Sequence, residues 1–200
     1  MKNRTKQIAL IVSSVLVLFS LSGCMPQGEL MTSQPEASSG EVSGDTSGTT
    51  SQEEVNEREL SIDGITLTLP EGWKTQGGTT LTFYPSNYPE DSSNIDIQSI
   101  EHTAKFGLIN QEDYISALEK SLRVVDKEIE VTTDIFEQTQ VAGKEALKIK
   151  LHYTLSGITI TQTQYAVKAD RLYWIALTEE NEEKWNDTFE EVISSIQFQK

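Results

Sequence analysis

The stretch Glu145-Ala-Leu-Lys-Ile-Lys-Leu-His-Tyr-Thr-Leu155 decides the fold of this chain. From Leu147 onward its apolar residues fall on every second position, and polar or charged residues stand between them. A period of two is typical of a β-strand with one face in a core and the other in water. Ala142-Gly143 and Ser156-Gly157 mark its two ends and favour hairpin turns, so we expect antiparallel neighbours.

The two segments that follow this strand are more apolar. Residues 158–168 form the returning strand, and their apolar positions change phase between Ile160 and Tyr165, which indicates a β-bulge or partial burial of both faces. Leu172-Tyr-Trp-Ile-Ala-Leu177 is apolar throughout, as expected for a central strand covered on both sides. This part of the chain therefore predicts an antiparallel run of about four strands.

Helical spacing occurs on both sides of that run. Residues 111–125 place Tyr114, Ile115, Leu118, Leu122 and Val125 on one helix face. The last helix is expected to start at the glutamates 179, 180, 182 and 183, because negative charge is favourable at the positive end of a helix dipole. Its apolar face comprises Trp185, Phe189, Val192, Ile193 and Ile196.

The beginning of the domain is rich in short β-prone runs. Residues 60–69 read as two strands joined by Asp63-Gly64, a dipeptide suited to the positive φ angles of a tight hairpin. Further strands are expected at residues 80–84 and 95–100. The order of strands, helix, strands and helix predicts an α+β domain, a mainly antiparallel β-sheet flanked by helices, over residues 59–200.

Two stretches resemble the PsbP/Mog1-like superfamily. They are Ile65-Thr-Leu-Thr-Leu-Pro-Glu-Gly-Trp73 and Tyr173-Trp-Ile-Ala-Leu177, the latter followed by Phe189-Glu-Glu-Val-Ile-Ser-Ser-Ile-Gln-Phe198. The resemblance covers roughly residues 59 to 199 and implies an α/β/α sandwich around an antiparallel sheet. Members of the superfamily are accessory or binding proteins of unrelated systems, so the resemblance implies no catalytic residues for this chain.

The N-terminal residues 1–23 have the layout of a secretory signal. A basic start with Lys2, Arg4 and Lys6 precedes an apolar stretch at residues 8–21, which at about 14 residues is too short to span a bilayer as a stable helix. Leu21-Ser-Gly-Cys24 then resembles the lipobox of bacterial lipoproteins, which implies cleavage between Gly23 and Cys24. The thiolate of Cys24, the only cysteine, is the nucleophile that lipidation requires. We expect attachment to the lipid bilayer on the extracytoplasmic face of the cell membrane.

Residues 24–58 are expected to form a disordered tether after the lipidated cysteine. They are dominated by Ser, Thr, Gly, Glu, Gln and Pro and contain no aromatic residue. Such a segment buries too little apolar surface to offset the entropy of ordering its backbone. It gives the domain reach above the membrane.

Charge excludes one class of partner. The formal net charge is −15, and it becomes −18 when the three basic residues before Cys24 are removed. An acidic chain without a basic patch repels nucleic acid and anionic headgroups, so we expect no nucleic-acid partner.

Catalytic and metal-binding patterns are missing from the sequence. The two histidines, His102 and His152, have no Cys, His or carboxylate at metal-ligand spacing, and His152 falls on the polar phase of its strand. There is no Gly-x-Ser-x-Gly elbow, P-loop or dinucleotide fingerprint. Neither the acidic run 179–183 nor the pair Asp91 and Asp96 has the spacing of a calcium loop. We expect no metal, no cofactor and no enzymatic activity.

The segment Phe83-Tyr-Pro-Ser-Asn-Tyr-Pro-Glu-Asp91 is the candidate partner-binding loop. Aromatic side chains in a surface loop suit recognition, since they present a large area with little entropy to lose. Tyr84, Tyr88 and the nearby Trp73 are the candidate residues, and the alternative for each is packing against the sheet or the core. We therefore expect a non-enzymatic binding or accessory module for an envelope protein or small ligand. An enzyme of hydrolase type with an unrecognised site, or a purely structural envelope component, are the alternatives.

Overall fold

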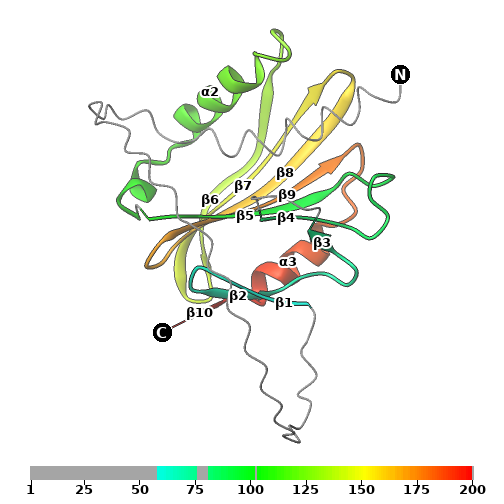
Figure 1. Cartoon of the computed structure of the whole chain (residues 1–200). Helices are drawn as coiled ribbons and strands as arrows, with labels where there is room; N and C mark the ends of the chain where they lie inside the picture. Colours follow the sequence, from blue (N-terminus) through cyan, green and yellow to red (C-terminus); the bar gives the residue numbers. More distant parts are fainter. Residues whose placement is uncertain (1–57, 76–80, 102, 200) are drawn as a thin grey trace, which may run out of the picture.

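The computed structural model describes residues 58–75, 81–101 and 103–199. Its strands form two antiparallel sheets, one of three strands in the order β1-β2-β10 and one of seven in the order β3-β4-β5-β9-β8-β7-β6 (Figure 1). The strand bounds are β1 Glu59–Ile62, β2 Ile65–Thr68, β3 Lys74–Thr75, β4 Leu81–Tyr84, β5 Asn94–Ile100, β6 Val131–Val141, β7 Lys144–Leu155, β8 Ile158–Lys168, β9 Leu172–Glu180 and β10 Gln197–Phe198. The helices are the 3-10 helix η2 Thr103–Leu108 and the α-helices α2 Gln111–Leu122 and α3 Asn186–Ser194.

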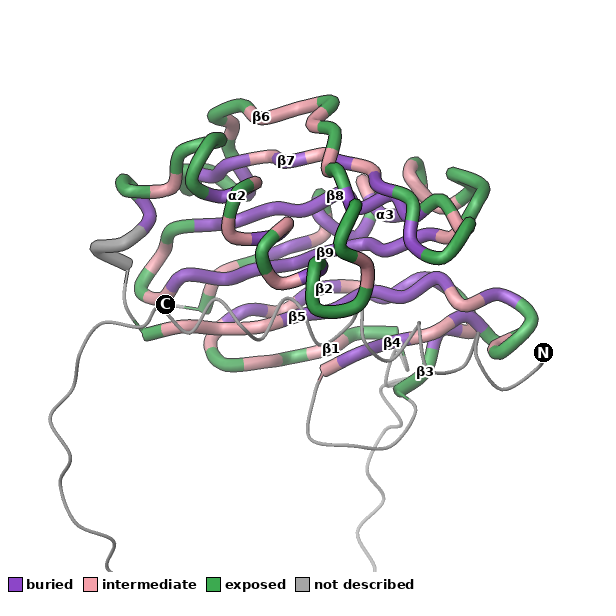
Figure 2. The backbone as a smooth tube through the Cα atoms, turned by 90° about the horizontal axis from the view of Figure 1, so that it is seen from above, coloured by how far each residue is buried: buried purple, intermediate pink, exposed green. Residues whose placement is uncertain are grey.

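The large sheet contains the strands that alternation and apolar content predict. β7 buries Leu147, Ile149, Leu151, Tyr153 and Leu155 and leaves the residues between them partly or fully exposed. β9 lies between β5 and β8, and its residues 172–179 are all buried, so the prediction of a central strand is confirmed (Figure 2).

The structure of β8 shows which of two explanations for its phase change is right, a β-bulge or burial of both faces. Its residues 160–167 are buried on both faces, and its register with β7 runs without a shift from Ala146 opposite Val167 to Leu155 opposite Ile158. A bulge in β8 is therefore the wrong alternative. The register shift lies instead in β6, between Thr133 and Ile135, because Asp134 is an extra residue there.

Two hydrophobic cores cover the two faces of the large sheet. Helix α3 and the small sheet pack on one face around side chains such as Ile175 and Phe189. Helix α2 and η2 pack on the other face, where Leu118 and Leu122 of α2 lie in one cluster with Ile149 of β7. The two α-helices thus flank the sheet from opposite sides, and the predicted α+β sandwich is confirmed (Figure 1).

The helices differ from the prediction at two ends. Helix α2 ends at Leu122, and Val125 is 42% exposed, so its assignment to the apolar face is wrong. Helix α3 begins at Asn186, after the glutamates, because β9 continues through Glu180 and the backbone turns at Asn181 with a φ of 63°. Burial of a strand end in the sheet therefore outweighs the preference of glutamate for a helix start.

The hairpin between β1 and β2 has the predicted tight turn. Asp63 and Gly64 have φ angles of 46° and 95°. The hydroxyl of Tyr173 donates to the carbonyl oxygen of Asp63 at 2.7 Å, and a Cβ at Gly64 would lie 3.1 Å from that hydroxyl. The turn therefore packs directly against β9, and glycine satisfies both its φ angle and the lack of space.

Candidate functional site

The candidate partner-binding segment contains the end of β4, with Tyr84, and the loop from β4 to β5, with Tyr88. The rings of Tyr84 and Tyr88 lie with centroids 4.5 Å apart at an interplanar angle of 50°, and both side chains are half-buried. Two turn hydrogen bonds shape the loop, from Tyr88 N to Pro85 O at 3.0 Å and from Glu90 N to Asn87 O at 2.9 Å. The structure brings these two predicted residues together on one surface.

Asp91 ties this loop to the start of α3. Its Oδ2 accepts from the indole nitrogen of Trp185 at 3.0 Å and pairs with Nζ of Lys184 at 2.6 Å, while its Oδ1 accepts from Ser93 N at 3.1 Å. The Asp91 side chain is 7% exposed. Buried carboxylates require such donors, so the loop is held by a satisfied ionic contact.

The charge of Asp91 is favoured by these donors. Burial alone would raise the pKa of this carboxyl, but the hydrogen bonds from Lys184, Ser93 and Trp185 together lower its pKa below the ordinary value. Asp91 is therefore ionised at neutral pH and holds the loop under physiological conditions.

Trp73 does not belong to the loop surface. It is buried, with its ring T-shaped against that of Trp185 at a centroid distance of 5.2 Å, and it is part of the core between the sheet and α3. Trp73 supports the loop indirectly, since Trp185 also donates to Asp91. Of the three predicted residues, only Tyr88 thus lies in the surface loop, and Tyr84 is the last residue of β4 beside it.

A row of buried polar side chains crosses the sheet on the face that carries Tyr84. Strand alternation places Thr82 on the same face as Tyr84, and residues opposite each other on paired strands share a face. Thr82 donates a hydrogen bond to Asp96, and Oδ1 of Asn94 accepts none from the described residues. We call these six residues the polar row: Thr82, Asn94, Asp96, Gln162, Gln164 and Thr178.

Hydrogen bonds link one end of the polar row to two aromatic residues. Oε1 of Gln164 accepts from the hydroxyl of Tyr114 at 2.6 Å and from Nε1 of Trp174 at 3.0 Å. Gln164 Nε2 donates to Gln162, and Gln162 Nε2 donates to Thr178, at 3.0 and 3.1 Å. The Tyr114 and Trp174 rings stack at 5.7 Å. Burial raises the pKa of the Tyr114 hydroxyl far above its usual range, so it remains a donor.

Sequence reasoning missed this row. Gln162 and Gln164 stand on alternate positions of β8, which is the pattern of a solvent-facing strand side. Burial across β5, β9 and β8 depends on contacts between residues far apart in the chain. The only local signal was the phase change between Ile160 and Tyr165.

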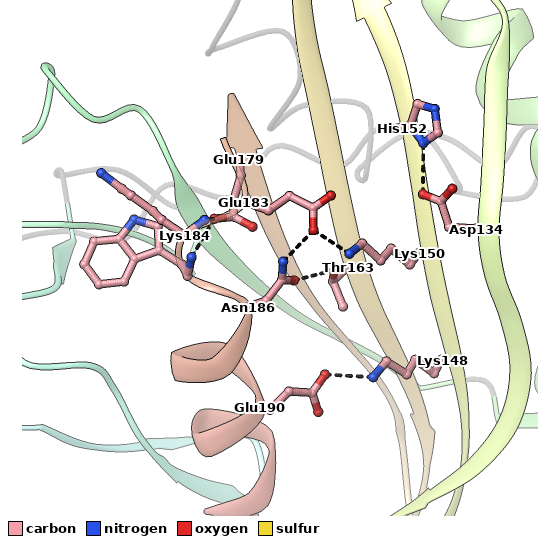
Figure 3. Close-up of polar contacts among 11 residues, drawn as sticks. Asp134, Lys148, Lys150, His152, Thr163, Glu179, Glu183, Lys184, Asn186 and Glu190 are labelled. Atoms are coloured by element: carbon pink, nitrogen blue, oxygen red, sulfur yellow. Dashed lines mark hydrogen bonds and ion pairs between the residues drawn. The ribbon is translucent and has the colours of Figure 1, made fainter. Parts of the chain in front are cut away.

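The opposite face carries three basic side chains on β7, namely Lys148, Lys150 and His152 (Figure 3). Nζ of Lys148 pairs with Glu190 at 2.8 Å, Nζ of Lys150 pairs with Glu183 at 2.5 Å, and Nδ1 of His152 lies 2.9 Å from Asp134. Glu183 also accepts from Asn186, which in turn accepts from Thr163 (Figure 3). Each of these three basic side chains therefore has an acidic partner.

The His152 side chain is 43% exposed, which confirms the prediction that it faces solvent. Asp134, the extra residue of the β6 bulge, reaches it and is itself 37% exposed. Within the described ranges, no group of three His, Cys, Asp or Glu residues is arranged to hold a metal ion.

Glu179, near the end of β9, holds the turn before α3 rather than a cation. Its Oε1 accepts from the backbone nitrogens of Lys184 and Trp185 at 2.8 and 2.7 Å. Burial raises the pKa of Glu179 above its ordinary value, and the two backbone donors oppose that rise. Glu179 therefore fixes the turn that connects β9 to α3.

An open pocket of about 430 Å³ lies between α2 and β6. It combines two carboxylates with apolar and hydroxyl groups, and its lining comprises Gln111, Glu112, Ile115, Ser116, Glu119, Val131 and Thr133. Glu119 is engaged on both oxygens, with Arg123 at 2.7 Å and with Val131 N at 3.1 Å. The pocket is thus lined by both acidic and apolar side chains.

Solved structures share this arrangement of sheet and helices. The cyanobacterial PsbP protein CyanoP from Synechocystis sp. PCC 6803 matches with a TM-score of 0.50 and 16% identity, over 75% of this chain and 98% of CyanoP. The fold is PsbP-like. At this identity the likeness concerns the PsbP-like fold alone, and the fold that the sequence resemblance implied is confirmed.

Two further structures are similar at a lower level. A protein from Bacteroides thetaiotaomicron has a TM-score of 0.47 and 14% identity over 73% of this chain, which spans 50% of that protein's length. LpqN, described as involved in cell envelope biogenesis of Mycobacterium tuberculosis, has a TM-score of 0.44 and 12% identity, over 71% of this chain and 90% of LpqN. No protein-family model matches the sequence, and no curated protein is similar to it.

Four predicted features lie outside the described residues: the secretory signal 1–23, the cleavage position at Gly23 and Cys24 with its lipid anchor, the tether up to residue 57, and His102. Arg58, predicted as the last residue of the tether, is bound to the domain instead, since its Nε donates to the carbonyl oxygen of Leu69 at 2.9 Å. The part of the chain that the structure describes contains no helix long and apolar enough to cross a membrane.

Proposed function

We propose that this chain is an extracytoplasmic lipoprotein, attached to the cell membrane through Cys24, whose PsbP-like domain is a non-enzymatic binding module for an envelope protein. The observation that supports the binding role is the pair formed by Tyr84 at the end of β4 and Tyr88 in the following loop, which the contacts of Asp91 with Lys184 and Trp185 hold in place. Preorganised aromatic residues lose little conformational entropy on binding, so they contribute efficiently to an interface.

The positions of the titratable side chains with shifted pKa values favour a binding role over a catalytic one. An active site is expected to gather titratable groups of shifted pKa around a concave pocket. In the described ranges, the groups with shifted pKa values are Asp91, Tyr114, Lys148, Tyr153, Tyr165, Tyr173 and Glu179, and none of them lines the pocket between α2 and β6. Burial and structural pairing account for these shifts without a reaction.

The anchor and the loop are tested together by crosslinking in cells followed by affinity capture. We expect the wild-type chain to recover one membrane or wall protein. Cys24→Ala should lose both the membrane attachment and that protein, because a single tether positions the domain. Tyr88→Ala should stay in the membrane fraction and recover several-fold less of the protein, since truncating an aromatic anchor costs about 1 to 3 kcal/mol of binding.

The matched control is Asn87→Ala, an exposed residue of the same loop. It should recover the same protein as the wild type. If Tyr88→Ala recovers as much of the captured protein as the wild type, the loop is not the binding site. If Cys24→Ala remains attached to the membrane, Cys24 is not the anchor.

A further inference from the structure

Strand β6 forms an open border of the large sheet. It pairs with β7 on one side, and Figure 2 shows it at the margin of the sheet. After the bulge at Asp134, residues 135–141 run in regular register with β7. Within the described ranges, no backbone hydrogen bond joins residues 135–141 to a partner other than β7. Alternate N–H and C=O groups of this stretch therefore point away from the sheet.

Beyond its bulge at Asp134, this border lacks the usual protection of an edge strand. Proteins shield such edges with lysines, prolines, very short strands or bulges. At the other border, β3 is two residues long, whereas residues 135–141 read Ile-Phe-Glu-Gln-Thr-Gln-Val and contain no lysine and no proline. Glu137 is their one charged residue, and it is exposed. The regular half of β6 is therefore suited to accept another strand.

The acidic pocket adjoins the beginning of this edge. Val131 and Thr133 of β6 line it together with Ile115 and Glu112 of α2. Glu112 forms no ion pair with the described residues, in contrast to Glu119. An aliphatic stem can pack against Ile115 and Val131 while its cation meets Glu112, which is the chemistry of a lysine or arginine side chain.

We propose that β6 accepts an extended, lysine- or arginine-bearing segment of another protein as an additional strand, with one cationic side chain in the pocket between α2 and β6. The inference rests on the proposed binding function and specifies the partner as an extended segment with basic side chains. Main-chain hydrogen bonds supply affinity in such strand addition, and the pocket supplies specificity. A second copy of this chain fits less well, because each copy has a net charge of −15 and presents Glu137 on the edge.

The test uses the full chain in a mild detergent and a capped peptide of about nine residues, long enough to span the edge, in which lysine alternates with valine and threonine. Calorimetry should show binding that weakens with salt, and amide exchange of residues 135–141 should slow when the peptide is present. A peptide N-methylated at alternate residues should not bind, because it cannot form the ladder. A peptide with glutamate in place of lysine should bind at least about tenfold more weakly.

Variants of the chain separate edge pairing from general charge attraction. Glu137→Lys should weaken peptide binding by about tenfold, whereas Glu90→Lys, which changes the net charge equally on the distant loop, should change it by less than about twofold. Glu112→Gln should weaken binding of the lysine peptide. At a saturating peptide concentration, however, amide exchange of residues 135–141 should slow as much as it does in the wild type.

Several outcomes would overturn the inference. They are no binding of the lysine peptide, equal binding of the N-methylated peptide, equal loss in Glu137→Lys and Glu90→Lys, or protection of residues 135–141 that rises with protein concentration in the absence of peptide. The last result would make a second copy the occupant. If the peptide does not bind while capture in cells still depends on Tyr88, strand addition at β6 is wrong and the proposed binding function is retained.

Discussion

At the residue scale, Asp91 shows how a single carboxylate organises the candidate loop. Its donors come from two places, Ser93 in the loop and the segment of Lys184 and Trp185 near α3, and Trp185 is 94 positions away in the sequence. Each bond is charge-assisted, and such bonds are stronger than neutral ones. Loss of the charge should therefore affect both the loop and the stability of the domain.

We expect Asp91→Asn to lower the free energy of unfolding by about 1.5 to 3 kcal/mol at neutral pH, the range for hydrogen bonds to charged groups. Urea unfolding monitored by tryptophan fluorescence measures this change. Glu90→Gln is the matched control, because it removes an exposed carboxylate from the same loop and should stay within about 0.5 kcal/mol of the wild type.

The same variant predicts a pH dependence. The folded-state pKa of Asp91 is lowered, so its contribution to stability is fully present above the unfolded-state pKa and is lost as pH falls through the folded-state pKa. The stability difference between the wild type and Asp91→Asn should hence be largest at neutral pH and shrink below about pH 4. A difference that grows on acidification would contradict the ionised state of Asp91.

At the element scale, α3 joins the two sheets. Its buried side chains Phe189, Val192 and Ile193 lie in the same core as β2 of the small sheet and β9 of the large one. Ser195 Oγ, just after the helix, accepts from Thr68 N at 2.8 Å and so ties the helix end to the small sheet. Packing of α3 therefore positions β1, β2 and β10 as well as the helix.

Phe189→Ala should lower the free energy of unfolding by about 3 to 5 kcal/mol, because the ring is 1% exposed and its removal leaves a cavity. Chemical denaturation measures the loss. Glu191→Ala on the exposed side of the same helix should change stability by less than about 0.5 kcal/mol. Similar values for the two variants would mean that α3 does not anchor the core.

At the scale of the whole molecule, both cores are built within the domain. The buried apolar residues of the described ranges run from Ile65 to Ile196. Residues 25–57 of the expected tether contain no aromatic residue, so they offer little apolar surface to add. The domain boundary near residue 58 stays a prediction from composition.

A fragment of residues 58–200 should consequently unfold in one cooperative transition with a midpoint close to that of residues 25–200. The expected difference in free energy of unfolding is less than about 1 kcal/mol, since few apolar contacts are removed. Paired urea titrations measure it. A non-cooperative transition in the shorter fragment would show that the tether is part of the folded unit.

Much of the fold could be predicted where the pattern is local. The alternation in β7 and the turn at Asp63-Gly64 depend on neighbouring residues, and both predictions are confirmed. The start of α3 was predicted wrongly, since Glu179 is buried at the end of a strand by residues distant in the sequence. For the candidate loop, composition indicated the tyrosines, whereas its anchor on Trp185 could not be read from spacing.

The sequence by itself determined the longer strands, the hairpin turns and the α+β class, and the pattern of residues 1–24 predicts export and lipidation. These features depend on side chains a few positions apart, and the periodicity of those side chains can be read without knowing the long-range contacts. Only the tertiary structure decided which polar residues are buried, as with Gln162 and Gln164, and which distant partner holds Asp91. The physical reason is that burial and ion pairing depend on long-range contacts formed when the sheet assembles, and no local pattern encodes them.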